Sequence, residues 1–96
     1  MRASGRERDL PPRIAARRDK LLGTWAAAHM GLIGEDAASY AMSIVEAGAG
    51  GGNDKAIVKK VCGDLVARGF PIVEQDIGRL FQEFSARARV ECSDDK

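Results

Sequence analysis

The chain has 96 residues, of which 45% are hydrophobic and 30% charged, a composition that indicates a single globular domain of modest size. Only 5% of the residues are aromatic, so the core has to consist mainly of Leu, Ile, Val, Ala and Met side chains. No apolar run approaches the ~20 residues of a membrane-spanning helix, and the first ten residues lack the apolar stretch of a secretory signal. We therefore expect a cytoplasmic protein without membrane insertion.

The net charge of +1 conceals an uneven distribution. Residues 1–20 hold seven basic and three acidic side chains, a net charge of +4, whereas residues 21–96 hold eight basic and eleven acidic ones, a net charge of −3. A basic segment on a mildly acidic body indicates contact with an acidic surface of protein, nucleic acid or membrane. A solvated segment that only aids solubility agrees equally well with this pattern.

Residues 1–12 show no apolar period and end in Leu10-Pro11-Pro12. Because paired prolines fix φ and remove two N–H donors, no helix runs through them unbroken, although a helix can begin there. We expect residues 1–12 to form a flexible basic arm.

From Arg13 onward the sequence predicts a helix. Apolar residues recur in one row at helical spacing with a second row beside it: Leu21, Trp25, Ala28 and Leu32, then Leu22, Ala26 and Met30. Gly23 costs about 1 kcal/mol relative to alanine inside a helix, which indicates the close approach of another helix. Gly31 is well placed to end this helix in the left-handed conformation.

A second helix is predicted to open at Gly34-Glu35-Asp36, where acidic side chains suit the helix dipole. Its inner face is Ala37, Tyr40, Ala41, Ile44 and Val45. Residues 47–52 include four glycines and are predicted to end this helix in a flexible loop.

Two further amphipathic helices follow. The third is capped by Asn53 or Asp54 and ends at Gly69, with an inner stripe of Ile57, Val58, Val61, Cys62, Leu65 and Val66. The fourth starts near Val73 or Glu74 and presents Ile77, Leu80, Phe81, Phe84 and Ala88 on one face. The sequence thus predicts an all-α fold, a compact four-helix bundle over residues 13–91, with a disordered tail at residues 92–96.

No catalytic or metal-binding arrangement is evident, so we expect neither an enzyme nor a cofactor. His29 has no second histidine to act with, and neither cysteine has the spacing of a metal ligand. The run GAGGGNDK is no phosphate loop, because no Ser or Thr follows Lys55 and no strand precedes it. We expect Cys62 to be buried and Cys92 to be a spare thiol, with no disulfide between them.

The candidate partner-binding residues are five arginines near the start of the chain: Arg6, Arg8, Arg13, Arg17 and Arg18. No later helix exposes a dense row of arginines and base-reading polar side chains, which argues against nucleic acid as the partner. Trp25 could anchor a protein partner, although its place in an apolar row favours the core.

Three stretches of the sequence form a recognisable pattern: RRDKLLGTWAA at residues 17–27, GLIGEDAASYA at residues 31–41 and KKVCGDLVARGFPIVEQDIGRL at residues 59–80. The pattern resembles the zeta subunit family, small proteins of alphaproteobacteria that regulate ATP synthase. The likeness covers about residues 13–90. It implies a four-helix bundle that binds the catalytic head of ATP synthase and blocks wasteful ATP hydrolysis.

In that family, inhibition is assigned to an N-terminal segment that becomes helical and wedges between catalytic subunits. Residues 1–16 depart from the family pattern, since they contain no Phe anchor, only Leu10 and Ile14, and carry the proline pair. We therefore expect a zeta-like regulator whose inhibition is weak or absent. The alternatives are a non-inhibitory helical interaction module and a module that binds a small ligand, such as a nucleotide, in a groove of the bundle.

Overall fold

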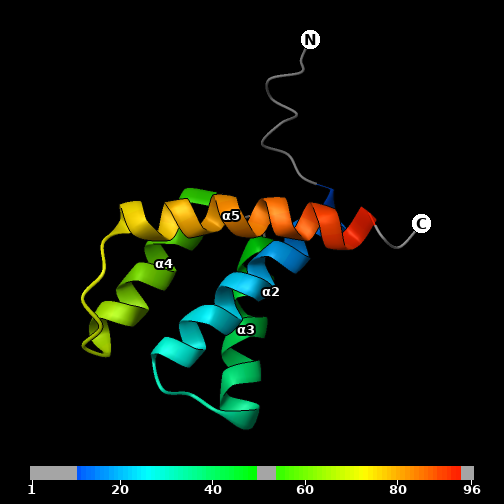
Figure 1. Cartoon of the computed structure of the whole chain (residues 1–96). Helices are drawn as coiled ribbons and strands as arrows, with labels where there is room; N and C mark the ends of the chain where they lie inside the picture. Colours follow the sequence, from blue (N-terminus) through cyan, green and yellow to red (C-terminus); the bar gives the residue numbers. More distant parts are fainter. Residues whose placement is uncertain (1–10, 50–53, 94–96) are drawn as a thin grey trace.

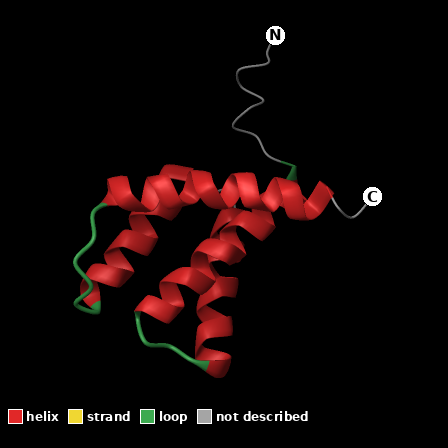
Figure 2. Ribbon diagram, viewed as in Figure 1, coloured by secondary structure: helices red, strands yellow, loops and turns green. Residues whose placement is uncertain are grey.

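The computed structural model describes residues 11–49 and 54–93, and their regular structure is entirely helical (Figure 2). The helices are α2 (Pro12–His29), α3 (Gly34–Ala49), α4 (Asp54–Ala67) and α5 (Glu74–Ser93). This confirms the predicted all-α, four-helix fold. Most of the predicted arm, residues 1–10, and the end of the predicted tail, residues 94–96, lie outside the described residues.

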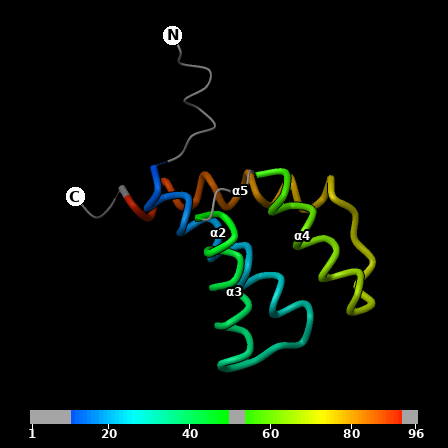
Figure 3. The backbone as a smooth tube through the Cα atoms, turned by 180° about the vertical axis from the view of Figure 1, so that it is seen from behind, coloured from blue at the N-terminus to red at the C-terminus, as the bar shows by residue number. Residues whose placement is uncertain are grey.

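Helix α2 is the central element of the domain. It lies along α3 and also contacts α4 and α5, and α5 lies across both α2 and α4 (Figure 1). Seen from behind, α3 and α4 extend from the same side of α5 (Figure 3). In both views the start of α2 lies beside the end of α5, so residues far apart in the sequence meet at one end of the domain.

All the described helices contribute to one core: Leu22, Ala26, Ile44, Ile57, Val61, Cys62, Leu65, Ile77 and Phe81. Of the two apolar rows that the sequence predicts for α2, the second lies deeper in the core than the first. Leu22 and Ala26 are fully buried, whereas Trp25 is partly buried and Ala28 is exposed. Because α2 packs against helices on more than one side, its innermost positions hold compact side chains and the large indole lies at the rim of the core.

The other predicted faces are confirmed with one exception. Ala41 and Ile44 of α3 and Ile77, Phe81 and Ala88 of α5 are buried, as the sequence predicts: each lies on its helix's inner face. On α4, however, Val66 is 53% exposed, because the helix presents only one narrow side to α5 and the α2–α3 pair.

Both predicted glycine stops are confirmed. Gly31 has φ 82° and Gly69 has φ 87°, in the left-handed region that favours glycine. The amide of Leu32 donates to the Ala27 carbonyl at 2.9 Å, and the amide of Phe70 donates to the Leu65 carbonyl at 3.0 Å. These bonds satisfy carbonyls that the helix ends leave without an intrahelical partner, and they make both ends Schellman motifs.

Three helix boundaries differ from the predicted ones. Helix α2 begins with Pro12 in its first turn, one residue earlier than expected. Helix α3 continues through Gly48 to Ala49, into the stretch predicted as loop, because Gly48 packs against α2 there. Helix α5 continues to Ser93, so two residues of the predicted tail are helical.

The predicted close approach at Gly23 is also confirmed. A Cβ atom placed on Gly23 would lie 2.7 Å from the Cα atom of Ala41, nearer than real Cβ contacts allow. Glycine at this position therefore sets the distance between α2 and α3.

This contact predicts opposite effects for two Gly→Ala substitutions. Gly23→Ala should lower the free energy of unfolding by about 1–2 kcal/mol, since the overlap with α3 outweighs the gain in helix propensity. Gly63→Ala is the matched control, because a Cβ atom on Gly63 of α4 meets nothing within 4 Å. It should raise the free energy of unfolding by about 0.5–1 kcal/mol. Urea unfolding curves measure both changes, and stabilisation by Gly23→Ala would contradict the packing described above.

Candidate partner-binding surface at the start of α2

The first turns of α2 are joined to the last turns of α5. The Nε–H of Arg17 donates to Oε1 of Glu91 at 2.6 Å, and Nη2 of Arg13 donates to the carbonyl oxygen of Cys92 at 3.2 Å. Arg87, one turn before Glu91, donates from its Nε to Oε2 of Glu91 at 3.1 Å. The hydrogen bonds from both arginines hold the pKa of Glu91 below its ordinary value. The end of α5 thus supports the arginine-bearing start of α2.

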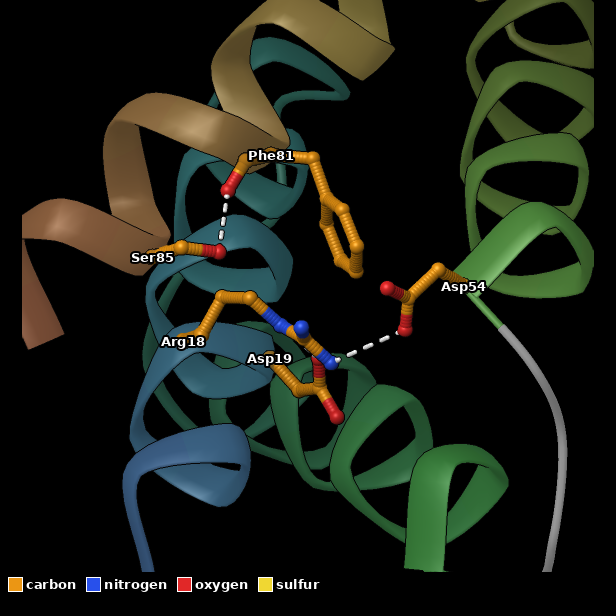
Figure 4. A network of polar contacts seen from close by, with 5 residues as sticks. All are labelled: Arg18, Asp19, Asp54, Phe81 and Ser85. Atoms are coloured by element: carbon orange, nitrogen blue, oxygen red, sulfur yellow. Dashed lines mark hydrogen bonds and ion pairs between the residues drawn. The ribbon is translucent and has the colours of Figure 1, made fainter. Parts of the chain in front are cut away.

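Arg18 points the other way, into the domain. Its side chain is 6% exposed, its Nε–H donates to Oδ1 of Asp19 at 3.0 Å, and its Nη2 donates to Oδ1 of Asp54 at 3.4 Å (Figure 4). The guanidinium group also lies over the ring of Phe81, 4.0 Å from the ring centre. Arg18 therefore links α2 with α4 and α5 from within.

Asp19 completes this buried cluster. Its side chain is 3% exposed, and its carboxylate packs against Gly48 of α3, where a Cβ atom would overlap its Oδ2. Burial raises the pKa of Asp19 above its ordinary value of 3.8, and this effect outweighs the opposing charge of Arg18, while the charge of Asp54 raises the pKa further. Gly48, which the sequence places in a loop, is therefore a packing residue that makes room for a buried carboxylate.

The structure separates the five arginines that the sequence proposes for partner binding. Arg13 is exposed and Arg17 is partly exposed on the same end of the domain, whereas Arg18 is buried and engaged within the chain. Arg6 and Arg8 lie outside the described residues.

Sequence reasoning misses the acidic partners of these arginines. Glu91 is 74 positions from Arg17, and no local pattern in the sequence connects them. Asp54 carries a weak signal, because it is recognisable as a residue at the start of α4, but its bond to Arg18 depends on the tertiary fold.

At the opposite end of α2, three rings lie together. The ring centres of Trp25 and His29 are 4.3 Å apart, and those of His29 and Phe70 are 5.2 Å apart. The Nδ1–H of His29 donates to the Trp25 carbonyl at 2.9 Å. Through these contacts His29 has a structural role, because it packs the end of α2 against Phe70, which follows α4.

A polar bond joins α3 and α4. The hydroxyl of Tyr40 donates to Oδ2 of Asp64 at 2.8 Å, and Lys60 bonds the same oxygen at 3.3 Å. Burial raises the pKa of the Tyr40 hydroxyl, and the hydrogen bond to the Asp64 carboxylate raises it further. The tyrosine hydroxyl therefore stays neutral and donates the hydrogen bond that links α3 to α4.

Within residues 11–49 and 54–93, no group of three or more His, Cys, Asp and Glu side chains is arranged to hold a metal ion. Cys62 and Cys92 are free thiols, and Cys62 is buried as predicted. None of the helices in the described part of the chain is long and apolar enough to cross a membrane.

Comparison with known families agrees with the pattern seen in the sequence. Residues 5–91 match the family model for ATPase inhibitor subunit zeta, which covers most of the chain. The chain belongs to this zeta family. No curated protein and no solved structure gives a significant match.

The structure explains several residues that carry the zeta-family resemblance. Arg18 is the buried cation at the centre of the domain, Gly23 permits the contact between α2 and α3, and Gly31 ends α2. Tyr40 fastens α3 to α4. Of the paired arginines in the motif, one is therefore structural and only Arg17 reaches the surface.

The buried cluster predicts a large cost for removing its cation. Arg18→Ala should lower the free energy of unfolding by about 3 kcal/mol or more, because Asp19 would remain buried without its partner. Arg79→Ala is the control, since Arg79 is 64% exposed and bonds Asp76 at the surface. It should cost less than about 1 kcal/mol. Equal costs in chemical denaturation would contradict a central role for Arg18.

The raised pKa of Asp19 predicts a pH dependence of stability. Just above pH 3.8 the folded chain keeps a proton on Asp19 that the unfolded chain has released, so this group destabilises the fold as pH rises through its folded pKa. Asp19→Asn removes this titration. The unfolding free energy of the variant minus that of the wild type should therefore rise as the pH is raised from about 3.8 through the folded pKa of Asp19. Parallel profiles in denaturation series over this range would contradict the prediction.

Proposed function

We propose that the protein binds the catalytic head of ATP synthase and acts there as a weak inhibitor of ATP hydrolysis. The observation that carries the proposal is the zeta-family match over residues 5–91, which includes both the helical domain and most of the basic segment before it. A regulatory role at ATP synthase follows from the family. The site of binding and the strength of inhibition are our inferences from the chain itself.

The proposed contact surface is the basic start of the chain with the first turns of α2. Arg13 and Arg17 lie at this surface, and the proposal includes Arg6 and Arg8, which precede them. Arg18 is left out, because its guanidinium group is already bonded to Asp19 and Asp54 inside the domain. Exposed guanidinium groups bind carboxylates in a planar, bidentate manner, which suits an acidic protein surface.

The weakness of inhibition is inferred from the backbone at the prolines. Pro11 precedes α2 with φ −53° and ψ 146°, an extended conformation, and Pro12 occupies the first helical position. A proline disfavours the α conformation in the residue before it, so α2 cannot continue backwards through Pro11 as one straight helix. A helix formed by the preceding residues on binding would be separated from α2 by this break, and its position would be less well defined.

An ATPase assay with the purified catalytic head tests the proposal. The protein should bind the head at micromolar concentrations and lower its ATP hydrolysis only partly at saturation. The double substitution R13Q/R17Q replaces two arginines at the surface by neutral side chains. It should raise the dissociation constant about tenfold, because two charge-assisted contacts are lost. The matched control K55Q/K59Q removes the same charge from the exposed side of α4 and should leave binding nearly unchanged.

Three outcomes would contradict the proposal in different ways. Absence of binding would overturn the function, and complete inhibition at low micromolar concentration would overturn the inferred weakness. Equal losses in R13Q/R17Q and K55Q/K59Q would show that net charge alone matters, not the start of α2. NMR titration with a nucleotide tests the small-ligand alternative, which requires shifts among residues inside the domain.

A further inference from the structure

Glu91 lies between two arginines from different helices. One carboxylate oxygen accepts from Arg17 of α2 at 2.6 Å, and the other accepts from Arg87 of α5 at 3.1 Å. The carboxylate thus holds two guanidinium groups side by side, although their residues are 70 positions apart in the sequence. Two cations gathered around one anion leave a local positive excess.

Glu91 binds both arginines at Nε, the side-chain nitrogen nearest the backbone. In each case the hydrogen bond to Glu91 is donated by Nε, and 41% of the Arg17 side chain and 59% of the Arg87 side chain stay exposed. This geometry restricts the rotation of the long side chains and leaves their terminal ends at the surface. Pre-orientation lowers the entropy that a flexible side chain loses when it binds.

The neighbouring described residues add to the positive charge. Arg13 reaches the last turn of α5 from α2, and Arg89 is exposed on α5 itself. In the described part of α5 the nearest acidic side chain before Glu91 is Glu83, two turns away. Among the described residues, this surface therefore carries more positive than negative charge, which suits a partner that presents acidic groups.

We propose that Arg17, Arg87 and Glu91 form a paired guanidinium site that receives two carboxylates of the protein partner. Arg17 and Arg87 make the contacts, and Glu91 is a positioning residue that sets their separation and orientation. The inference rests on the proposed function and extends its surface from the start of the chain to the end of α5. Two side chains on different helices select for a pair of acidic groups at matching distance, which a free basic segment cannot do.

Substitution of Arg87 tests whether α5 takes part in binding. Arg87→Gln should raise the dissociation constant for the purified catalytic head about tenfold. Arg79→Gln is the matched control, because Arg79 is exposed on the same helix and also bonds a single carboxylate, that of Asp76. The control should bind like the wild type. Salt dependence gives a second readout, since Arg87→Gln should flatten the loss of affinity with rising ionic strength.

Substitution of Glu91 tests the positioning role. Glu91→Gln should weaken binding about fivefold, even though it makes the surface more positive, because the two guanidinium groups lose their common anchor. NMR should show sharp Nε–H signals of Arg17 and Arg87 in the wild type and exchange-broadened ones in the variant. Tighter binding by Glu91→Gln would overturn the proposal, because Glu91 would then be a competitor of the partner.

The remaining outcomes separate this inference from the function on which it rests. If the wild type does not bind the catalytic head, both are wrong. If the wild type binds and Arg87→Gln binds equally well, only the paired site is wrong. A duplex oligonucleotide that binds the wild type as tightly as the head does, with the same loss in Arg87→Gln, would assign the site to phosphates and overturn a carboxylate partner.

Discussion

The domain depends on one buried cation. Arg18 is buried, and an unpaired ion in a protein interior costs several kcal/mol of folding free energy. The surrounding side chains compensate for this cost. Asp19 and Asp54 neutralise the charge of Arg18, and the face of Phe81 covers it. These groups come from α2, α4 and α5, and α3 contributes the glycine that lets Asp19 fit. Groups from every described helix therefore meet at this one buried charge and its partner Asp19.

Helical periodicity was sufficient to predict the fold. The stripes of α3, α4 and α5 and the stops at Gly31 and Gly69 follow from local rules, because apolar spacing and left-handed glycines act over a few residues. For α2 the sequence predicts two adjacent apolar rows, and the structure buries Leu22 and Ala26 of the second row. A helix with neighbours on several sides has no single apolar stripe. Periodicity alone therefore does not show that Trp25 lies at the rim of the core and Leu22 at its centre.

The site was harder to predict, because its contacts are long-range. Nothing local distinguishes Arg17 from Arg18, yet the first reaches the surface and the second is buried. The direction of each side chain depends on which helix lies opposite, and that is decided by packing. Gly48 illustrates the same limit, since a glycine beside three others indicates a loop, and only the presence of Asp19 explains its place within α3.

The contacts that support the start of α2 come from the other end of the chain. Arg17 and Glu91 are 74 positions apart, and Arg13 and Cys92 are 79 apart. During synthesis the N-terminal helices leave the ribosome first and can pack against each other early, but these two bonds form only after nearly the whole polypeptide has emerged. A truncated or still-growing chain would consequently hold the α2–α3 pair without the bonds to α5, so the arrangement of arginines at this end of the domain would be the last feature acquired.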